Sequence, residues 1–505
     1  MGKHAYSIQP GHLHLSEPTT KSLSVRKALV WSFAERYASL VITLVSTMLL
    51  ARLLTPAQVG VFSLCAAFTI LASILRDFGI SEYLIQEKDL TKDKLQAAFG
   101  MAILTAWSIA VFILLFRHAM AEFYAEAGVA QVLAVMSLNF IILPFASPAF
   151  ALLNREMAFK KIFVIQTICS LVHASTAVTL AYYGHGYMSL AWAPIASIVV
   201  QTILVTCLRP KESLLMPNLG SAKAVLNYGL MFVTSRMIES TTRNAHEFII
   251  AKQFDFGSVG IFSRAFGLIE LFFTNITSAI LRVASPSFAT DHRAGIPLDG
   301  TFSRGTAIFT SIGFPFLGFI SLMSGDVIQV LFGHQWDAAA PIASVLAISL
   351  IPAYLVVLAP NLLAATGNVK RRLQISLWYS PVHLVGILAA SFVSLQAVAA
   401  IWGLSNMVML LMYGRHLAVV LNKPAHLLFA PSLRSAMVAV VSVLGQFATL
   451  HVCQHFDLPP LVNLLLVVPV GAICWLAAIK LLKHPVYDEI VQLMARFRAR
   501  GAQTS

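Results

Sequence analysis

Stretches of apolar residues long enough to cross a lipid bilayer recur along the whole chain, with short polar segments between them. A membrane-spanning helix needs about 20 predominantly apolar residues, and we predict about fourteen such helices, followed by a short amphipathic segment. The predicted spans are residues 28–52, 58–76, 97–117, 128–151, 162–183, 187–208, 224–250, 257–281, 303–324, 341–365, 373–394, 396–421, 431–453 and 458–482.

The composition agrees with an all-α polytopic membrane protein. Of the 505 residues, 58% are hydrophobic and only 11% are charged, whereas a soluble domain carries roughly 25% charged residues. No predicted loop is long enough for a soluble catalytic domain, and no phosphate-binding loop motif occurs. The five cysteines lie in apolar segments without metal-ligand spacing. We therefore expect a transporter rather than an enzyme, without catalytic residues, metal or cofactor.

Lysine and arginine residues orient the predicted helices. Most of them fall in the segments that face one side of the membrane, and the opposite loops hold only Arg52, Arg117 and Lys252. Basic loops face the cytoplasm in membrane proteins, so both termini are predicted to be cytoplasmic. The net charge of +13 then reflects membrane topology, and we expect no nucleic-acid partner.

An internal repeat relates two outer turns of the chain. Residues 51–63 match residues 251–263 without a gap, at an offset of 200. Because six predicted helices separate the copies, the two halves would run parallel, related by an axis along the membrane normal. The identical pairs are Ala51/Ala251, Val59/Val259, Gly60/Gly260, Phe62/Phe262 and Ser63/Ser263.

The repeat predicts a two-lobed transporter with two added helices. We expect a cytoplasmic tail over residues 1–26, a six-helix lobe over 27–210, a second six-helix lobe over 211–422, two further helices over 423–484 and an amphipathic cytoplasmic tail over 485–505. In such an architecture, a cavity between the lobes opens alternately to each side of the membrane.

Ionisable residues inside the predicted spans are candidates for substrate binding, because each costs at least about 2.5–3.5 kcal/mol at the middle of a helix. Arg236, Glu239, Arg243 and Glu247 are spaced by three or four residues and would form one stripe. Arg36 precedes Arg236 by the repeat offset, and two arginines at one depth could bind a diphosphate through their guanidinium groups.

Other polar residues extend this candidate cavity. Arg264 would add a further cation, and Gln166 and Asn361 could contact sugar hydroxyls or bond between helices. The alternative is that the intramembrane charges only pair with one another and fix helix packing. The candidates for coupling to H⁺ or Na⁺ are Glu35, Glu239, Glu247 and Glu270.

Several segments resemble the Wzx-type polysaccharide transporters, which share a superfamily, the multidrug/oligosaccharidyl-lipid/polysaccharide exporters, with the MATE transporters and the lipid II flippase. The resemblance covers roughly residues 25–420 and departs at Asn244-Ala245-His246-Glu247, where relatives tend to show an Asn-Asp pair. The segments that carry it are Ala51–Phe62, Asp77–Ser81, Leu84–Thr91, Asn154–Lys161, Phe332–Pro341 and Leu363–Gly367.

The resemblance implies a flippase that moves undecaprenyl-diphosphate-linked oligosaccharide from the cytoplasmic to the periplasmic leaflet of the bacterial inner membrane. Its glycan would serve exopolysaccharide, capsule or O-antigen assembly, and its neighbours would be membrane lipids, glycosyltransferases and a polysaccharide polymerase. One alternative is a cation-coupled, MATE-like exporter of small amphipathic molecules. Another is a membrane polysaccharide polymerase, although such enzymes usually need a larger outer loop.

Overall fold

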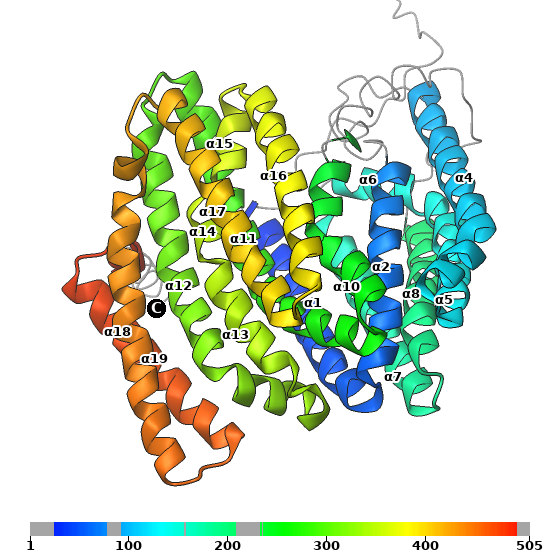
Figure 1. Ribbon diagram of the computed structural model, residues 1–505. Helices are drawn as coiled ribbons and strands as arrows, with labels where there is room; N and C mark the ends of the chain where they lie inside the picture. Colours follow the sequence, from blue (N-terminus) through cyan, green and yellow to red (C-terminus); the bar gives the residue numbers. More distant parts are fainter. Residues whose placement is uncertain (1–24, 78–91, 156–157, 209–232, 235, 492–505) are drawn as a thin grey trace, which may run out of the picture. The chain divides into compact units, whose positions relative to one another are not determined.

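The computed structural model describes residues 25–77, 92–155, 158–208, 233–234 and 236–491, and every regular element in these ranges is helical (Figure 1). The chain divides into two compact units, Met1–Asn244 and Ala245–Ser505. The predicted boundary between lobes, at residues 210 and 211, lies outside the described residues. The observed division falls within the predicted seventh span.

The first unit is a bundle centred on one strongly buried helix. Helix α5 packs against α2, α4 and α8, while α7 packs against both α1 and α8. Side chains of α5 such as Val129, Leu133 and Phe140 are almost fully buried. The elements of this unit are α1 (Val25–Leu53), α2 (Pro56–Asp77), α4 (Lys92–Tyr124), α5 (Ala127–Ile142), η1 (Leu143–Phe145), α6 (Ser147–Arg155), α7 (Phe159–Tyr182), α8 (Tyr187–Leu208) and the helical residues 236–243.

The second unit is built around α12, which packs against α11, α13, α18 and α19. Its elements are α10 (Ala245–Gln253), α11 (Phe256–Arg293), α12 (Leu298–Phe332), η3 (His334–Trp336), α13 (Ala339–Ser349), α14 (Ile351–Leu355), α15 (Ala359–Ala365), α16 (Val369–Ser391), α17 (Leu395–Val420), α18 (Ala425–His455) and α19 (Pro460–Leu481). Residues 485–491 form a last short helix.

Within the described ranges, thirteen helical segments are long and apolar enough to cross a membrane. The predicted span over 224–250 is described only in part, as residues 236–243 and α10. The prediction of an all-α polytopic membrane protein with about fourteen spans is therefore confirmed.

Proline residues divide two spans that the sequence predicts as single helices. The predicted helix over 128–151 is interrupted by the short 3-10 helix η1, which contains Pro144. The predicted helix over 341–365 is divided into α13, α14 and α15, with Pro352 and Pro360 near the starts of α14 and α15. Proline lacks the backbone N–H that a continuing helix needs, so it is tolerated at a helix start and breaks a helix interior.

The two repeated outer turns have the same structure. Helix α1 ends at Leu53 and α2 begins at Pro56, while α10 ends at Gln253 and α11 begins at Phe256. Thr55 Oγ1 accepts from the Gln58 N–H at 3.3 Å, and Gln58 Oε1 accepts from the Thr55 N–H at 3.1 Å. This reciprocal pair is a capping box that satisfies exposed backbone donors at the start of α2.

The second turn uses an aspartate in the equivalent position. Asp255 Oδ1 accepts from the Ser258 N–H at 2.6 Å, and a carboxylate is also favoured there by the helix dipole. The sequence repeat thus corresponds to a repeated helix–turn–helix.

Polar contacts join the two C-terminal helices to α12. Trp475 Nε1 on α19 donates to the Ser311 carbonyl on α12 at 2.7 Å. Thr310 on α12 donates to Ser435 on α18 at 2.9 Å, and Ser442 on α18 donates to the Gly471 carbonyl on α19 at 3.0 Å. Because water does not compete within the bilayer interior, such bonds fix helices to one another. Helices α18 and α19 are therefore part of the second unit's packing.

The helical residues 485–491 pack against α12, α18 and α19. Val486 packs with Val438 and Ile479 in a small apolar cluster, and Glu489 forms an ion pair with Arg304 at 2.7 Å. His484, which precedes the helix, is fully buried. Its Nε2 lies 3.0 Å from Ser435 Oγ, and its Nδ1 accepts from the Val486 N–H at 3.3 Å.

We expect a Gly313→Ala variant to be destabilised. A Cβ atom at Gly313 would lie 2.4 Å from the ring of Tyr354, which is fully buried and cannot move aside without repacking. Overpacking of this kind costs about 1–3 kcal/mol. The measurement is thermal unfolding of the purified protein in detergent. Gly325→Ala, on the same helix but facing open space, is the matched control and should be neutral or more stable; equal unfolding midpoints would contradict the packing assigned to Gly313.

We expect acidification to loosen the helix over 485–491. Burial, with a contribution from Arg434, lowers the pKa of His484, so the docked state binds a proton less readily than the undocked state. Docking is at full strength above about pH 6.5, the ordinary pKa of histidine, and weakens as the pH falls below that value. The mobility of a spin label at residue 491 would report the change in a background without native cysteines. His484→Asn, which cannot be protonated, should remove the pH dependence; if it persists, another group is responsible.

Candidate functional site

The predicted site residues of the first unit lie on two helices. Glu35 and Arg36 are half-buried on α1, and Gln166 is half-buried on α7. These two helices pack along each other, and the hydroxyls of Ser39 and Ser170 meet at 3.2 Å between them. Arg36 takes part in a polar or ring contact.

The predicted stripe of alternating charges is divided in the structure. Arg236, Glu239 and Arg243 share the helical residues 236–243, where the arginines are exposed and Glu239 is half-buried. All three take part in contacts. Asn244 is a turn residue between this segment and α10, so the predicted stripe does not lie on one uninterrupted helix. Glu247 lies beyond the turn on α10 and is 7% exposed.

Glu247 instead belongs to a buried polar cluster in the second unit. Its neighbour His246 is 2% exposed, and His246 Nε2 lies 3.6 Å from Glu247 Oε1. The imidazole of His246 packs against the rings of Phe262 and Phe266 on α11, with ring centroids 5.0 and 4.8 Å apart. A carboxyl group and an imidazole are thus held together in apolar surroundings.

Helices α16 and α17 complete the cluster. Trp402 on α17 lies between two histidines, with ring centroids 5.8 Å from His246 and 4.7 Å from His383 of α16. Tyr379 stacks on His383 and donates from its hydroxyl to Asn406 Oδ1 at 3.3 Å. We refer to His246, Glu247, His383 and Trp402 as the buried histidine cluster.

Several polar atoms of the buried histidine cluster have no hydrogen-bond partner among the described residues. They are Nδ1 of His246, Oε2 of Glu247, both ring nitrogens of His383 and Nε1 of Trp402. Buried polar atoms in proteins are nearly always paired with protein or water, and each unpaired one costs about 1–3 kcal/mol. Unsatisfied groups gathered in this way are retained where they serve a function, such as binding a proton, an ion or water.

Two members of the cluster lie at similar distances from the ends of their helices. His246 is seven residues from the end of α10 at Gln253, and Trp402 is seven residues from the start of α17 at Leu395. At a rise of 1.5 Å per residue, both are about 10 Å along their helices from these ends.

Sequence reasoning identified Glu247 but did not select His246, His383 or Trp402 as site residues. A histidine inside a long apolar helix such as α16 is the one available signal, because an ionisable group at that depth is costly. The convergence of α10, α16 and α17 on one point is a property of the fold, and the sequence does not display it.

The remaining predicted residues of the second unit lie elsewhere. The guanidinium of Arg264 sits over the rings of Phe332 and Trp336, 5.0 and 4.7 Å from their centroids, so it makes cation–π contacts inside the unit. Glu270 Oε1 accepts from the Thr274 hydroxyl at 2.6 Å on α11. Asn361 is half-buried on α15.

Three named bacterial proteins are similar in sequence to between 63% and 88% of this chain. The teichuronic acid biosynthesis protein TuaB of Bacillus subtilis (strain 168) is 22% identical over 88% of this chain and 93% of its own length. The lipopolysaccharide biosynthesis protein WzxC of Escherichia coli (strain K12) is 22% identical over 63% of this chain and 65% of its own length. The succinoglycan biosynthesis transport protein ExoT of Rhizobium meliloti (strain 1021) is 21% identical over 66% of this chain and 67% of its own length.

Two solved structures share the fold. The inward closed conformation of the lipid II flippase MurJ superposes with a TM-score of 0.71 at 13% identity, over 90% of this chain and 99% of that chain. An inward-facing MATE multidrug resistance transporter of the MOP superfamily gives a TM-score of 0.54 at 16% identity, over 81% of this chain and 98% of that chain.

The predicted resemblance to polysaccharide transporters is confirmed by a family match. The family described as "Polysaccharide biosynthesis protein" matches residues 49–341, which is more than half of the chain and includes both repeated outer turns. The fold agrees with this assignment, because its structural neighbours are a lipid II flippase and a multidrug resistance transporter. The chain is a multi-pass membrane protein that belongs to the polysaccharide biosynthesis protein family.

Proposed function

We propose that this protein is a flippase that moves a lipid-linked oligosaccharide from the cytoplasmic to the periplasmic leaflet of the bacterial inner membrane. The observation that carries the proposal is the combination of the family match with a fold that is shared, over 90% of the chain, with the lipid II flippase MurJ. The relatives named for lipopolysaccharide biosynthesis and succinoglycan transport support a glycan cargo. Both termini would be cytoplasmic, as the basic inner loops indicate.

The cargo would be held through its diphosphate. Arg36, Arg236 and Arg243 are the proposed ligands, because a guanidinium keeps its charge at all relevant pH values and matches the geometry of phosphate oxygens. Gln166 and Asn361 would contact sugar hydroxyls. The lipid would be undecaprenyl diphosphate, and its binding site would open to one side of the membrane at a time. Glycosyltransferases would supply this cargo, and a polymerase would consume it on the periplasmic side.

The buried histidine cluster would couple this movement to protons. The pair His246–Glu247 is electrically neutral when it carries one proton, whether as imidazole with carboxylic acid or as imidazolium with carboxylate. Loss of that proton leaves a net negative charge among the rings of Phe262, Phe266 and Trp402, which is strongly unfavourable without water. Release of the proton is therefore linked to hydration of the cluster.

This linkage supplies a mechanism for transport. A conformation that keeps the cluster dry retains the proton, and a conformation that admits water releases it. A ligand shifts an equilibrium between conformations only by its differential affinity for them, and a proton bound at this pair would act as such a ligand. We assign Glu247 as the coupling carboxylate and prefer it to Glu35, Glu239 and Glu270, because it is the buried carboxylate whose second oxygen lacks a partner among the described residues.

We expect Arg236→Gln to abolish flipping. In a deletion strain complemented with this variant, surface polysaccharide should fall at least about ten-fold, the order expected when a charge-assisted hydrogen bond to phosphate is lost. Membrane abundance of the protein should stay the same. Arg293→Gln removes an exposed charge at the end of α11 and should leave polysaccharide unchanged. Normal polysaccharide in the deletion strain itself would reject the flippase function, and normal polysaccharide with Arg236→Gln would reject only the role of that arginine.

We expect Glu247→Gln to remove proton coupling. In vesicles that contain the lipid-linked oligosaccharide accumulated by the deletion strain, an imposed pH gradient should accelerate flipping by the unaltered protein and not by this variant. Glu270→Gln is the matched carboxylate control.

His383→Phe should keep the thermal stability, because an apolar ring of similar size replaces a group with two unpaired nitrogens, yet it should weaken the response to the gradient. Stimulation by a Na⁺ gradient at constant pH, or loss of coupling in Glu270→Gln alone, would refute the proton assignment at Glu247.

A further inference from the structure

A narrow apolar slot runs between α2 and α4 in the first unit. Its volume is about 180 Å³. An apolar cavity of roughly 150 Å³ holds a benzene-sized group, so the slot has room for several methylene groups of a hydrocarbon chain. Its lining is Phe68, Leu71, Ala72 and Leu75 of α2, Ile109, Phe112, Ile113, Phe116, Arg117 and Met120 of α4, and Leu133 of α5.

The slot exists because α2 and α4 both pack on α5 more extensively than on each other. Ala72 contributes only a methyl group to the wall, while Leu133 of α5 forms part of the floor. The slot is open along one side, where Leu75, Phe112 and Phe116 are 43%, 58% and 47% exposed. In a membrane, an open apolar slot of this kind faces hydrocarbon rather than water.

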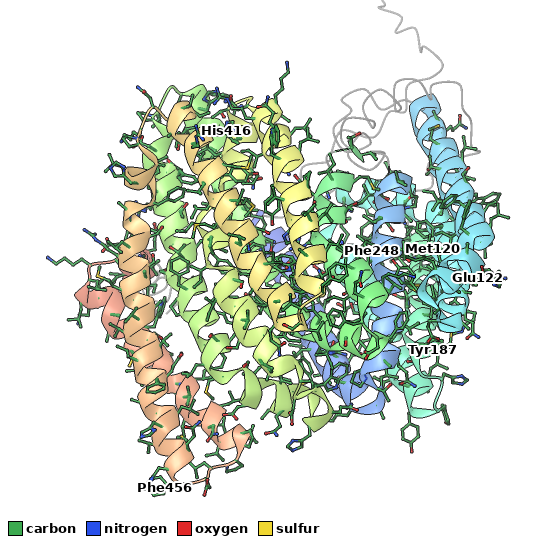
Figure 2. All side chains as sticks on the ribbon, viewed as in Figure 1. Met120, Glu122, Tyr187, Phe248, His416 and Phe456 are labelled. Atoms are coloured by element: carbon green, nitrogen blue, oxygen red, sulfur yellow. The ribbon has the colours of Figure 1, made fainter. Side chains whose placement is uncertain are left out.

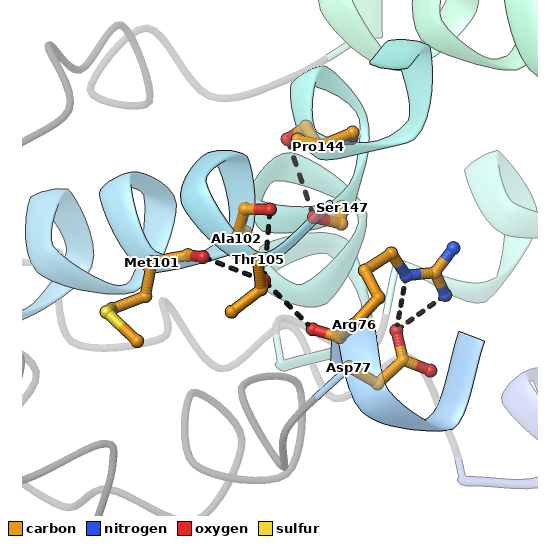
Figure 3. Close-up of polar contacts among 7 residues, drawn as sticks. All are labelled: Arg76, Asp77, Met101, Ala102, Thr105, Pro144 and Ser147. Atoms are coloured by element: carbon orange, nitrogen blue, oxygen red, sulfur yellow. Dashed lines mark hydrogen bonds and ion pairs between the residues drawn. The ribbon is translucent and has the colours of Figure 1, made fainter. Parts of the chain in front are cut away.

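Polar contacts join the two helices on the inner side of the slot. Thr105 of α4 donates from its hydroxyl to the backbone carbonyl of Arg76 on α2 at 3.2 Å (Figure 3). The guanidinium of Arg76 is paired with Asp77 at 2.5 Å and lies 5.6 Å from the ring centroid of Phe140. Arg76 is thus already bound within the protein.

Arg117 differs from Arg76. It lines the slot together with Met120, which lies three residues further along α4 and is labelled in Figure 2, and the Nε of Arg117 is buried without a hydrogen-bond partner among the described residues. Arg117 is seven residues from the end of α4 at Tyr124, or about 10 Å along the helix. In a helix that spans a bilayer, a residue at this distance from the helix end lies near the lipid headgroups, where a cation is stabilised by an anionic group.

We propose that the slot and Arg117 form a binding site for an anionic phospholipid of the outer leaflet. The guanidinium donates to the lipid phosphate, and one acyl chain runs along the slot toward the middle of the membrane. The cation at headgroup depth selects the charge of the lipid, and the apolar walls bind its chain. The site is separate from the proposed cargo and coupling residues, and it does not depend on the proposed function.

A second groove in the same unit provides an internal comparison. It lies between α7 and α8 and is larger, at about 570 Å³. Its lining is mostly apolar and includes Val172, Trp192 and Ala196, with His185 as the one ionisable residue and no lysine or arginine. It therefore lacks the permanent positive charge that Arg117 gives the slot.

The experiment compares binding of phosphatidylglycerol and phosphatidylcholine to the purified full-length protein by native mass spectrometry. We expect the unaltered protein to prefer the anionic lipid. Arg117→Gln should lower phosphatidylglycerol binding about ten-fold, the order expected for loss of a charge-assisted hydrogen bond, and leave phosphatidylcholine binding unchanged. Arg117→Lys should restore part of the preference. Ala72→Phe fills the slot and should reduce binding without altering any charge, whereas Ala196→Phe in the second groove should not affect the preference.

Two results would overturn the proposal. The first is an equal preference for phosphatidylglycerol in the unaltered protein, Arg117→Gln and Ala72→Phe. The second is displacement of bound phosphatidylglycerol by undecaprenyl diphosphate in equimolar mixtures, with both variants losing the polyprenyl lipid instead, which would assign the site to the cargo. The melting temperature of each variant in detergent separates loss of binding from loss of folding.

Discussion

The absence of water from the bilayer interior is the constraint on which this structure depends. Backbone N–H and carbonyl groups must be satisfied within each segment, so the described chain crosses the membrane as helices. The same constraint acts on side chains. The hydroxyls of Thr310, Ser435 and Ser442 find partners on neighbouring helices, because an unpaired hydroxyl in hydrocarbon is costly.

The buried polar atoms without hydrogen-bond partners are the exceptions to this constraint, and they are the more informative groups. In the buried histidine cluster, polar atoms from α10, α16 and α17 lie together without partners among the described residues, although apolar side chains would pack there at lower cost. Arg264 shows the contrasting solution, since its guanidinium is covered by two aromatic rings. Arg264 Nε also lacks a hydrogen-bond partner among the described residues, but the two rings compensate its charge through cation–π contacts. In the buried histidine cluster the unpaired atoms belong to four side chains from three helices.

The sequence alone predicts the helices and the duplication of this protein well. The turn at Thr55–Pro56 and its copy at Asp255–Phe256 could be located because capping residues and the repeat offset are local signals. The ends of α11 and α12 could not be located in this way. Both helices continue into polar sequence beyond the apolar stretch that predicts a membrane span. Pro144 can be seen in the sequence, but the residues on both sides of it are apolar. A prediction based on hydropathy therefore joins the two helices across it. The burial of His246 beside Trp402 depends on contacts between distant segments, which no spacing rule supplies.

The hydrogen bonds from Trp475 to Ser311 and from Thr310 to Ser435 have a mechanical consequence. They tie α18 and α19 to adjacent residues of α12, so a rotation of α12 would carry this helical pair with it. The exposed apolar surface of the pair, which includes Leu433, Val440, Leu465 and Ile473, would then have to displace the surrounding lipid. The viscosity and thickness of the bilayer would therefore oppose such a rotation directly.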